Sequence, residues 1–140
     1  MTLLVRDCCL CLHMQRAARA LARRFDDALR AVGLKSGQFS LLVSLNRPDP
    51  PSIGSVARLL AMDRTTLTAN LKPLERRGLL TVVPDAEDRR SRRLTLTAAG
   101  LAKLEQAIPI WIATHAEIEK SLTGDAHALR AQLNEITFGR

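Results

Sequence analysis

Four arginines crowd one short stretch in the second half of the chain: Arg89, Arg90, Arg92 and Arg93. They follow residues 84–88, a run with proline and acidic residues that is typical of a turn. Guanidinium groups on a projecting turn repel one another, but they suit the enhanced negative potential of a narrow DNA minor groove. Asp88 can hold such a turn by accepting hydrogen bonds from backbone amides or by pairing with an arginine. A solvated charge run is the alternative interpretation.

A second set of polar side chains lies just upstream of these arginines. Leu67, Leu71 and Leu74 recur at steps of four and three, which predicts a helix that buries these three side chains. Its opposite face carries Arg64, Thr65, Thr68, Ala69, Lys72 and Arg76. Short threonine and alanine side chains let a helix enter the major groove, where threonine contacts base edges, while arginine and lysine bind phosphates. An ordinary solvated helix face is the alternative.

The segment that carries both sets has the order of a helix-turn-helix. Residues 55–63 predict a short helix and a tight turn, and Asp63 is a good N-cap whose charge suits the positive end of the next helix. Residues 79–83 and 89–96 predict two strands, so the arginines lie on a β-hairpin, or wing, directly after the helix pair. Pro73 lies inside the second helix, where it costs one backbone hydrogen bond and bends the helix.

A long amphipathic helix is expected over residues 10–32, because apolar residues recur there at steps of three and four. Gly33 can end this helix in a left-handed cap. Ser36 can then cap a second, shorter helix. The inward side chains of that helix are expected to be Phe39, Leu42, Val43 and Leu45.

Two further helices are expected after the hairpin. Thr97 can cap a long helix, which Pro109 interrupts, and a last helix follows residues 123–124. The long helix carries one apolar stripe: Leu101, Leu104, Ile108, Trp111, His115, Ile118 and Leu122. The last helix is expected to bury Leu129, Leu133 and Ile136. With the first helix, these stripes hold more apolar surface than the small middle lobe can cover, which predicts a dimer.

The predicted fold class is mainly α with a small β-hairpin wing, in a single domain over residues 1–140. A winged helix-turn-helix DNA-binding lobe would occupy residues 34–97, and a helical dimerisation lobe residues 6–33 and 98–140. The chain has 140 residues, of which 46% are hydrophobic, so it is long enough to bury one compact core. Its formal net charge of +7 favours a polyanionic partner, since each neutralised phosphate releases condensed counterions.

Several classes of protein are disfavoured by the sequence. No uninterrupted apolar run approaches the roughly 20 residues that span a membrane, so no membrane partner is expected. Three clustered cysteines, Cys8, Cys9 and Cys11, argue against a secreted disulfide framework, and a cytoplasmic location is expected. The chain has neither a paired nucleophile and base nor a glycine-rich phosphate loop, so we expect no enzyme activity and no cofactor.

The sequence resembles the MarR family of transcriptional regulators over residues 59–68, 74–80, 85–90 and 94–100. Residues 34–45 resemble the family's second helix. The resemblance implies a homodimer in which the first and the last two helices of each chain interlock, with two recognition helices on a pseudo-palindromic operator, usually for repression. It also implies that Arg90 is the wing-tip arginine and Asp88 its partner. Family members often carry basic residues where this chain has Val82 and Val83, so fewer phosphate contacts are expected there.

The sequence therefore predicts a dimeric bacterial transcription regulator, a repressor, that binds double-stranded DNA and is released by a small-molecule effector. The residues expected to contact DNA are Ser55, Arg64, Thr65, Thr66, Thr68, Asn70, Lys72, Arg76, Asp88, Arg89, Arg90 and Arg92. A winged-helix module that binds an acidic protein is the alternative. Steeply salt-dependent, sequence-selective binding to a duplex would separate the two hypotheses.

The cysteine cluster allows two sharper hypotheses. Its spacing is too compressed for a tetrahedral zinc site, so no metal is expected. A peroxide-sensing group within the family keeps a reactive cysteine near the start of the first helix, where Cys11 lies. That group holds the thiolate with tyrosines, and this chain has no tyrosine. We therefore favour small buried side chains at a dimer interface over a thiol-based redox sensor.

A site for an effector or an oxidant would draw on residues of the long helices. The candidates are Cys11, Met14, Arg16, Trp111 and His115. In the family such a pocket lies between the dimer helices and the DNA-binding lobe. A lone histidine on an apolar stripe is more often a packed residue than a ligand, and that is the alternative for His115.

Overall fold

The computed structural model describes residues 1–139, and its helices and hairpin confirm the predicted fold class. The elements are α1 (Thr2–Cys8), α2 (Leu10–Leu29), the 3-10 turn η1 (Arg30–Val32), α3 (Ser36–Leu45), α4 (Ile53–Leu59), α5 (Arg64–Arg76), β1 (Leu80–Pro84), β2 (Arg92–Leu96), α6 (Ala98–Lys120) and α7 (Ala126–Phe138). The two strands pair antiparallel, with Leu80 opposite Leu96 and Pro84 opposite Arg92.

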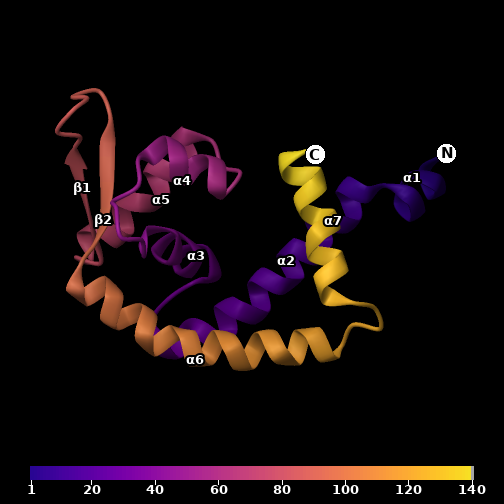
Figure 1. Cartoon of the computed structure of the whole chain (residues 1–140). Coiled ribbons are helices and arrows are strands. Elements are labelled where there is room, and N and C mark those ends of the chain that lie inside the picture. The colour runs from indigo at the N-terminus through magenta and orange to yellow at the C-terminus, as the bar shows by residue number, and fades with distance from the viewer. Residues whose placement is uncertain (140) are drawn as a thin grey trace.

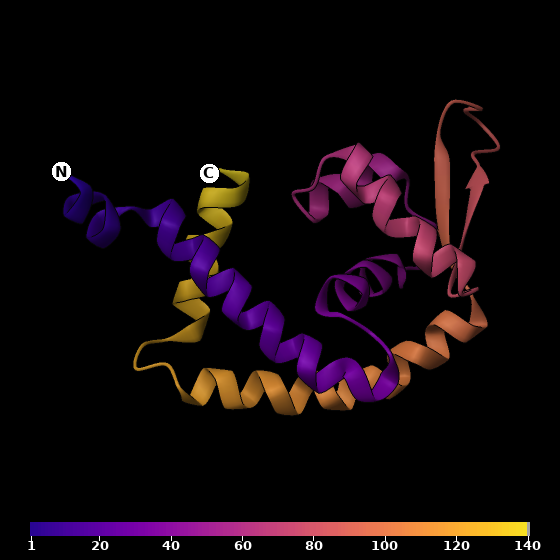
Figure 2. The same cartoon turned by 180° about the vertical axis from the view of Figure 1, so that it is seen from behind.

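These elements form two groups (Figure 1). α3, α4, α5 and the hairpin lie together on one side, and α2, α6 and α7 form a frame of longer helices. Seen from behind, α2 runs across α6 (Figure 2), and the two helices pack against each other. One core cluster joins both groups, since it contains Leu29 and Leu104 of the frame together with Leu42, Leu67 and Leu94. The shared core therefore fixes the helix-turn-helix on the frame.

The connection between α2 and α3 follows the expected course with a different cap. Gly33 has a φ of 70° and ends the first helical segment, as predicted. Ser36 was expected to cap α3, but Lys35 holds the cap position and Ser36 is the first helical residue. The amide of Ser36 instead donates a hydrogen bond to the Asp26 carboxylate at 2.6 Å. α3 is thus tied at its first residue to α2.

α3 buries more than the expected stripe. Val43 was predicted to point inward but is 45% exposed, whereas Leu41 is buried. α3 packs against α2, α4, α6 and β2, so several of its faces are covered at once. A pattern with one apolar face does not describe such a helix.

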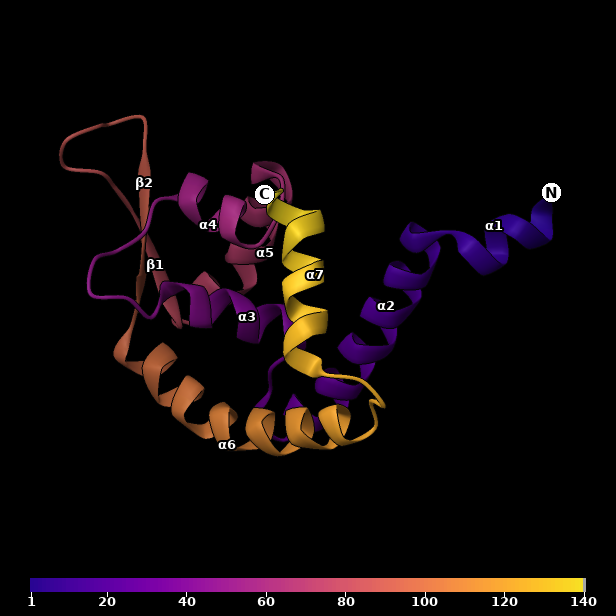
Figure 3. The same cartoon turned by 45° about the vertical axis from the view of Figure 1, so that its right-hand side comes forward.

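The N-terminal helix α1 was not predicted. Cys9 separates it from α2 in an extended conformation (φ −75°, ψ 106°), and its sulfur accepts a hydrogen bond from the amide of Leu12 at 3.4 Å. No residue of α1 is buried. In the three ribbon views α1 extends away from the other elements (Figures 1, 2 and 3).

The last helix does not bury its apolar face within one chain. Leu129, Leu133 and Ile136 of α7 are 42%, 39% and 59% exposed, so the expectation that they are buried is wrong for the isolated chain. Figure 3 shows α7 standing away from α6, beyond the loop that joins them. Leu101 and Ile108 of α6 are also exposed. Nothing within residues 1–139 covers these faces.

The start of α6 is fastened to the base of the hairpin. Thr97 caps α6 as predicted: its hydroxyl accepts from the Gly100 amide at 3.0 Å and donates to the Gly78 carbonyl at 2.6 Å. The Thr97 amide donates to the Leu79 carbonyl at 3.2 Å. A Cβ on Gly100 would lie only 2.0 Å from that same carbonyl oxygen. This close approach requires glycine.

α6 bends along its course (Figure 1), and Pro109 lies within it, as predicted. Among residues 1–139, no helix combines the length and the apolar character that crossing a membrane demands.

Candidate nucleic-acid interface

The turn between α4 and α5 has the expected geometry. Ala61 adopts a left-handed conformation with a φ of 49°, and the Met62 amide donates to the Ala57 carbonyl at 2.8 Å. Asp63 caps α5 as predicted, since its carboxylate accepts from the amide of Thr66 at 2.8 Å and from its hydroxyl at 2.7 Å. These hydrogen bonds, the backbone one first, lower the pKa of the Asp63 carboxyl. The cap sets the direction in which α5 leaves the turn.

The predicted buried face of α5 is confirmed, because Leu67, Leu71 and Leu74 are at most 2% exposed. The predicted contact residues of this helix are all exposed: Arg64, Thr65, Thr66, Thr68, Asn70, Lys72 and Arg76. The Thr68 hydroxyl donates to the Arg64 carbonyl at 2.8 Å, which leaves its oxygen as an acceptor and its methyl group in solvent. The face therefore offers one cation, Arg64, at its first residue, then small neutral groups, and further cations towards its end.

Ser55 helps to form the first turn of α4 and is only partly exposed. α4 begins at Ile53, and Ser52 is its N-cap, accepting from the Ser55 amide at 3.1 Å. The Ser55 hydroxyl donates back to the Ser52 carbonyl at 3.1 Å, and Ser55 is half-buried. The expected start of this helix at residue 55 was two residues late.

The hairpin starts its return strand later than predicted. Arg89 and Arg90 were expected on the strand, but β2 begins at Arg92 and both lie in the turn. The turn begins at the buried Asp85, whose carboxylate accepts from the Glu87 amide at 2.8 Å. It continues to residue 91 because the Ser91 amide donates to the Asp88 carbonyl at 3.0 Å.

Arg93 is directed inward by two partners. Its Nε donates to the Asp85 carboxylate, and its Nη1 donates to the Pro50 carbonyl at 3.2 Å. The backbone of Arg93 also forms an antiparallel β-bridge with Ser52. The adjacent Leu94 amide donates to the Pro51 carbonyl at 2.9 Å. The base of the wing is therefore joined to the segment that enters α4.

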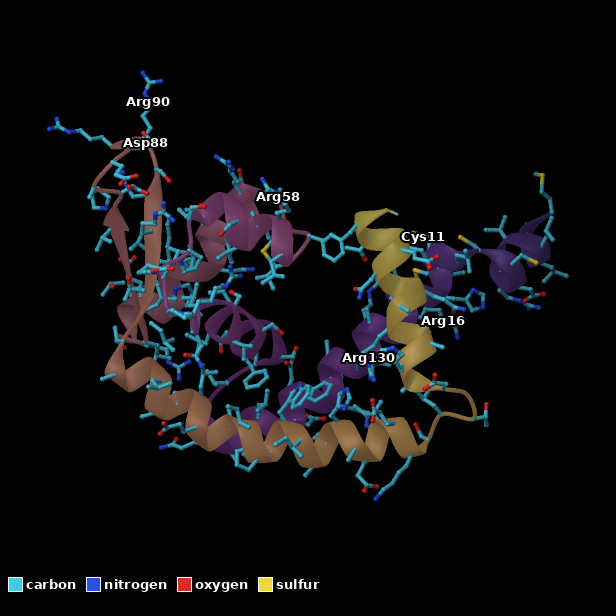
Figure 4. The ribbon with its side chains drawn as sticks, viewed as in Figure 1. Cys11, Arg16, Arg58, Asp88, Arg90 and Arg130 are labelled. Atoms are coloured by element: carbon cyan, nitrogen blue, oxygen red, sulfur yellow. The ribbon has the colours of Figure 1, made fainter. Side chains whose placement is uncertain are left out.

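The wing tip presents two free guanidinium groups. Asp88 was expected to hold the turn either through backbone amides or by pairing with an arginine, and the structure shows the first. Its carboxylate accepts a hydrogen bond from the Arg90 amide at 3.0 Å. The Arg92 side chain folds back to the Arg89 carbonyl at 3.0 Å. Within residues 1–139, the guanidinium groups of Arg89 and Arg90 have no hydrogen-bond or ion-pair partner. Figure 4 shows Arg90 projecting from the tip beside Asp88.

Arg58 was missed by the sequence analysis. It is exposed on α4 and projects on the side of the molecule towards which the wing tip points (Figure 4). The available signal was a cation within an otherwise apolar or small helix, Ile53–Leu59. Arg58 of α4 and the wing tip thus lie on one side of the molecule.

The wing turn should depend on the charge of Asp85. The Glu87 amide, and next the Arg93 guanidinium, hold the pKa of the Asp85 carboxyl below its usual range of about 3.9. A lowered folded-state pKa means that the stabilisation is present above the unfolded value and is lost as pH falls through the folded value. We expect the Glu87 and Asp88 amide resonances to keep their positions from pH 7 to 5 and to shift at lower pH. In Asp85→Asn they should already be shifted at pH 7, and unchanged resonances there would contradict this role.

Two of the candidate effector residues, Trp111 and His115, stack on each other. The Trp111 and His115 rings stack with centroids 4.7 Å apart, and Phe39 stacks on Trp111 at 6.3 Å, which favours a packed role for His115. Among the described residues, no hydrogen bond or ion pair joins this stack to Cys11, Met14 or Arg16.

The cysteines are accessible within one chain. Cys8 and Cys11 are exposed and Cys9 is half-buried, so the expected burial at a dimer interface would have to come from a second copy and stays a prediction. The Cys11 sulfur accepts from the Gln15 side chain at 3.3 Å. Residues 1–139 contain no group of three or more cysteine, histidine or carboxylate side chains placed to hold a metal ion.

Comparison with known proteins identifies this arrangement. The sequence model of the MarR family matches residues 34–91, from α3 to the wing turn. The Mycobacterium tuberculosis transcriptional regulator MosR, solved in complex with DNA, is 37% identical, with 92% of this chain and 93% of that chain covered and a TM-score of 0.85. This chain belongs to the MarR family. Its members are transcriptional regulators and not enzymes, as predicted.

Curated MarR-type relatives match part of the chain. The transcriptional activatory protein BadR of Rhodopseudomonas palustris is 37% identical over 91 residues, which are 63% of this chain and 52% of BadR. The organic hydroperoxide resistance transcriptional regulator of Bacillus subtilis is 28% identical over 101 residues, which are 72% of this chain and 69% of that protein. The match thus spans about half of the length of BadR and about two thirds of the second relative.

Proposed function

We propose that this MarR-family chain acts in the cytoplasm as a homodimer that binds a pseudo-palindromic DNA operator. The observation that carries the proposal is that Arg58 and the wing tip project on the same side of the molecule (Figure 4), beside a recognition helix whose predicted contact residues are all exposed. α5 enters the major groove, where Thr65 and Thr68 meet base edges. Arg90 reaches the adjacent minor groove. DNA binding is supported by MosR, which was solved in complex with DNA.

Lys72 and Arg76, with Arg58, bind phosphates on either side of the groove. These contacts fix the register of α5 without reading sequence. A regulator clamped in this way covers the promoter that overlaps its operator, so we propose repression. In vitro transcription from such a promoter tests the sign, and activation, as the name of BadR indicates for that relative, would contradict it.

The homodimer is supported by the apolar faces that one chain leaves uncovered. Leu129, Leu133 and Ile136 on α7 and Leu101 and Ile108 on α6 would be buried against a second copy. Dimerisation also sets two α5 helices one helical turn of DNA apart, about 34 Å, as a palindrome requires. Sedimentation at micromolar concentration should give a dimer, and a stable, fully helical monomer would contradict the proposal.

The test of DNA binding is selection of operator sequences followed by titration of Thr68→Ala. This variant should lose operator affinity by about tenfold and keep its affinity for random duplex, because a neutral side chain reports only base identity or local fit. Thr137→Ala on α7 is the matched control, since the Thr137 hydroxyl donates to the Leu133 carbonyl at 2.9 Å in the same i to i−4 geometry. If wild type binds every duplex equally, or an acidic protein instead, the proposal fails.

We propose that the effector is a small anion that binds a cleft at the junction of the two groups of elements. The cleft has a volume of about 540 Å³ and lies between the end of α2, the start of α3 and the end of α5. Three of its cations, Arg23, Lys35 and Arg77, have no ion-pair partner within residues 1–139. The two carboxylates of the cleft are occupied, Asp27 by Arg30 and Asp26 by the Ser36 amide. Organic anions that release the operator from wild type should fail to release it from Arg23→Gln.

A thiol-based signal is the second candidate function. The exposure of Cys11 at the start of α2 favours it, because a sensing thiol must meet its oxidant. The test is an operator titration before and after mild peroxide. A loss of tenfold or more in affinity that is absent in Cys11→Ser would support this function, and a loss under about threefold, below ~1 kcal/mol, would exclude it.

A further inference from the structure

Gly54 of α4 lies directly against the side chain of Arg64, the first residue of α5. Gly54 is the second residue of α4, and a Cβ at this position would lie 2.8 Å from Nη2 of Arg64, 3.5 Å from its Cζ and 3.9 Å from its Nε. Three atoms of the Arg64 guanidinium group thus lie within contact distance of the position that a Cβ at residue 54 would occupy. The Arg64 side chain rests on the backbone of α4, across the turn of the helix-turn-helix.

Space, and not charge, accounts for this position of Arg64. Its guanidinium has no hydrogen-bond or ion-pair partner within residues 1–139. The first turn of a helix carries partial positive charge, which does not attract a cation. The backbone carbonyl of Arg64 is held by the Thr68 hydroxyl, but its side chain is free to occupy the room above Gly54. A side chain at residue 54 would remove that room.

We propose that Gly54 is a positioning residue for Arg64, and that the room it leaves sets the place from which Arg64 binds a DNA phosphate. This inference rests on the proposed function. In a helix-turn-helix complex the first helix crosses the DNA backbone while the second enters the major groove. The Arg64 guanidinium lies between these two helices, against the first. It therefore meets the backbone at the edge of the groove, and the threonines further along α5 meet the bases.

The chain supplies a matched pair of glycines for the test. Gly54 is the second residue of α4 and Gly37 the second residue of α3, and a Cβ at Gly37 meets nothing within 4 Å. Alanine at either site brings the same gain in helix propensity. The atom displaced by Gly54→Ala is the tip of a flexible side chain, so both variants should fold with unchanged or slightly raised stability. Only Gly54→Ala should move the Arg64 guanidinium.

The expected result is a loss of DNA affinity in Gly54→Ala of about tenfold, equal for operator and random duplex. The slope of log affinity against log salt should fall by about two for a dimer that loses one phosphate contact in each half. Gly37→Ala should bind as wild type does. In the Arg64→Ala background, Gly54→Ala should have no further effect. An equal loss in that background, or wild-type affinity in Gly54→Ala, would overturn the proposal.

A second readout does not depend on DNA. The Nε–Hε resonance of Arg64 in the free protein should shift in Gly54→Ala and stay in place in Gly37→Ala. An unshifted resonance overturns the positioning role even if DNA binding changes. If wild type binds no duplex, the proposed function fails on that result alone, whereas the resonance still decides whether Gly54 places Arg64.

Discussion

Gly100→Ala should destabilise the folded chain by about 3 kcal/mol. This is the largest effect on stability that we expect from a substitution that adds atoms and removes no existing contact. The added Cβ would lie 2.0 Å from the Leu79 carbonyl oxygen and 2.8 Å from a methyl carbon of Leu96. The carbonyl cannot withdraw freely, because it accepts a hydrogen bond from the Thr97 amide. The start of α6 must then separate from the base of the hairpin. Urea unfolding followed by far-UV circular dichroism measures the loss.

The control for this result is again Gly37→Ala, which adds the same methyl group near the start of a helix where nothing lies within 4 Å. A helical alanine is favoured over glycine by up to about 1 kcal/mol. The control should therefore unfold at the same or a higher urea concentration than wild type. If Gly100→Ala behaved like the control, the close packing of α6 on Leu79 would not exist in solution.

Arg90→Ala should give the largest loss of DNA affinity among single substitutions, about 1–3 kcal/mol for each wing, and a shallower salt dependence. The guanidinium projects from the tip without a partner within the described chain, so it is available to the minor groove. The turn itself should survive, because Asp88 accepts from the backbone amide of residue 90, which alanine retains.

Fluorescence anisotropy with labelled operator at several salt concentrations measures this effect. Lys103→Ala is the control for the removal of one positive charge, since Lys103 lies on α6 and donates to Gln106 at 3.5 Å. Equal losses in both variants would mean that net charge, and not the wing tip, determines affinity. Wild-type binding by Arg90→Ala would show that the wing does not touch DNA.

The sequence was most informative where local rules coincide. α5 was predicted with the correct cap and buried face because Asp63, Leu67, Leu71 and Leu74 satisfy the capping rule and the helical period together. The wing boundaries were less accurate, because the turn residue Asp88 holds the Arg90 amide, which the strand pattern assigns to β2. The local sequence pattern predicts the turn, but not how many backbone amides the carboxylates of the turn will bind.

Contacts between distant residues lay beyond the pattern. The burial of Leu41 instead of Val43 depends on four neighbours of α3 that periodicity cannot locate. Arg64 resting on Gly54 joins two helices across a turn, and each residue alone is unremarkable in sequence. The exposed leucines of α7 were expected to be buried because hydrophobicity predicts that a face will be covered, without saying by which chain.

The hydrogen bonds between the wing base and residues 50–52 limit how the protein can adapt to different operators. Arg93 and Leu94 bind the carbonyls of Pro50 and Pro51, immediately before α4 begins. The hairpin therefore cannot swing without carrying the helix-turn-helix with it, and only the tip beyond Asp85 is free to adjust. In the proposed DNA complex, this connection would hold the major-groove and minor-groove contacts at a fixed separation. Operators with one base pair inserted within a half-site should be rejected, whereas changes at the outer minor-groove positions should be tolerated over the reach of an arginine side chain.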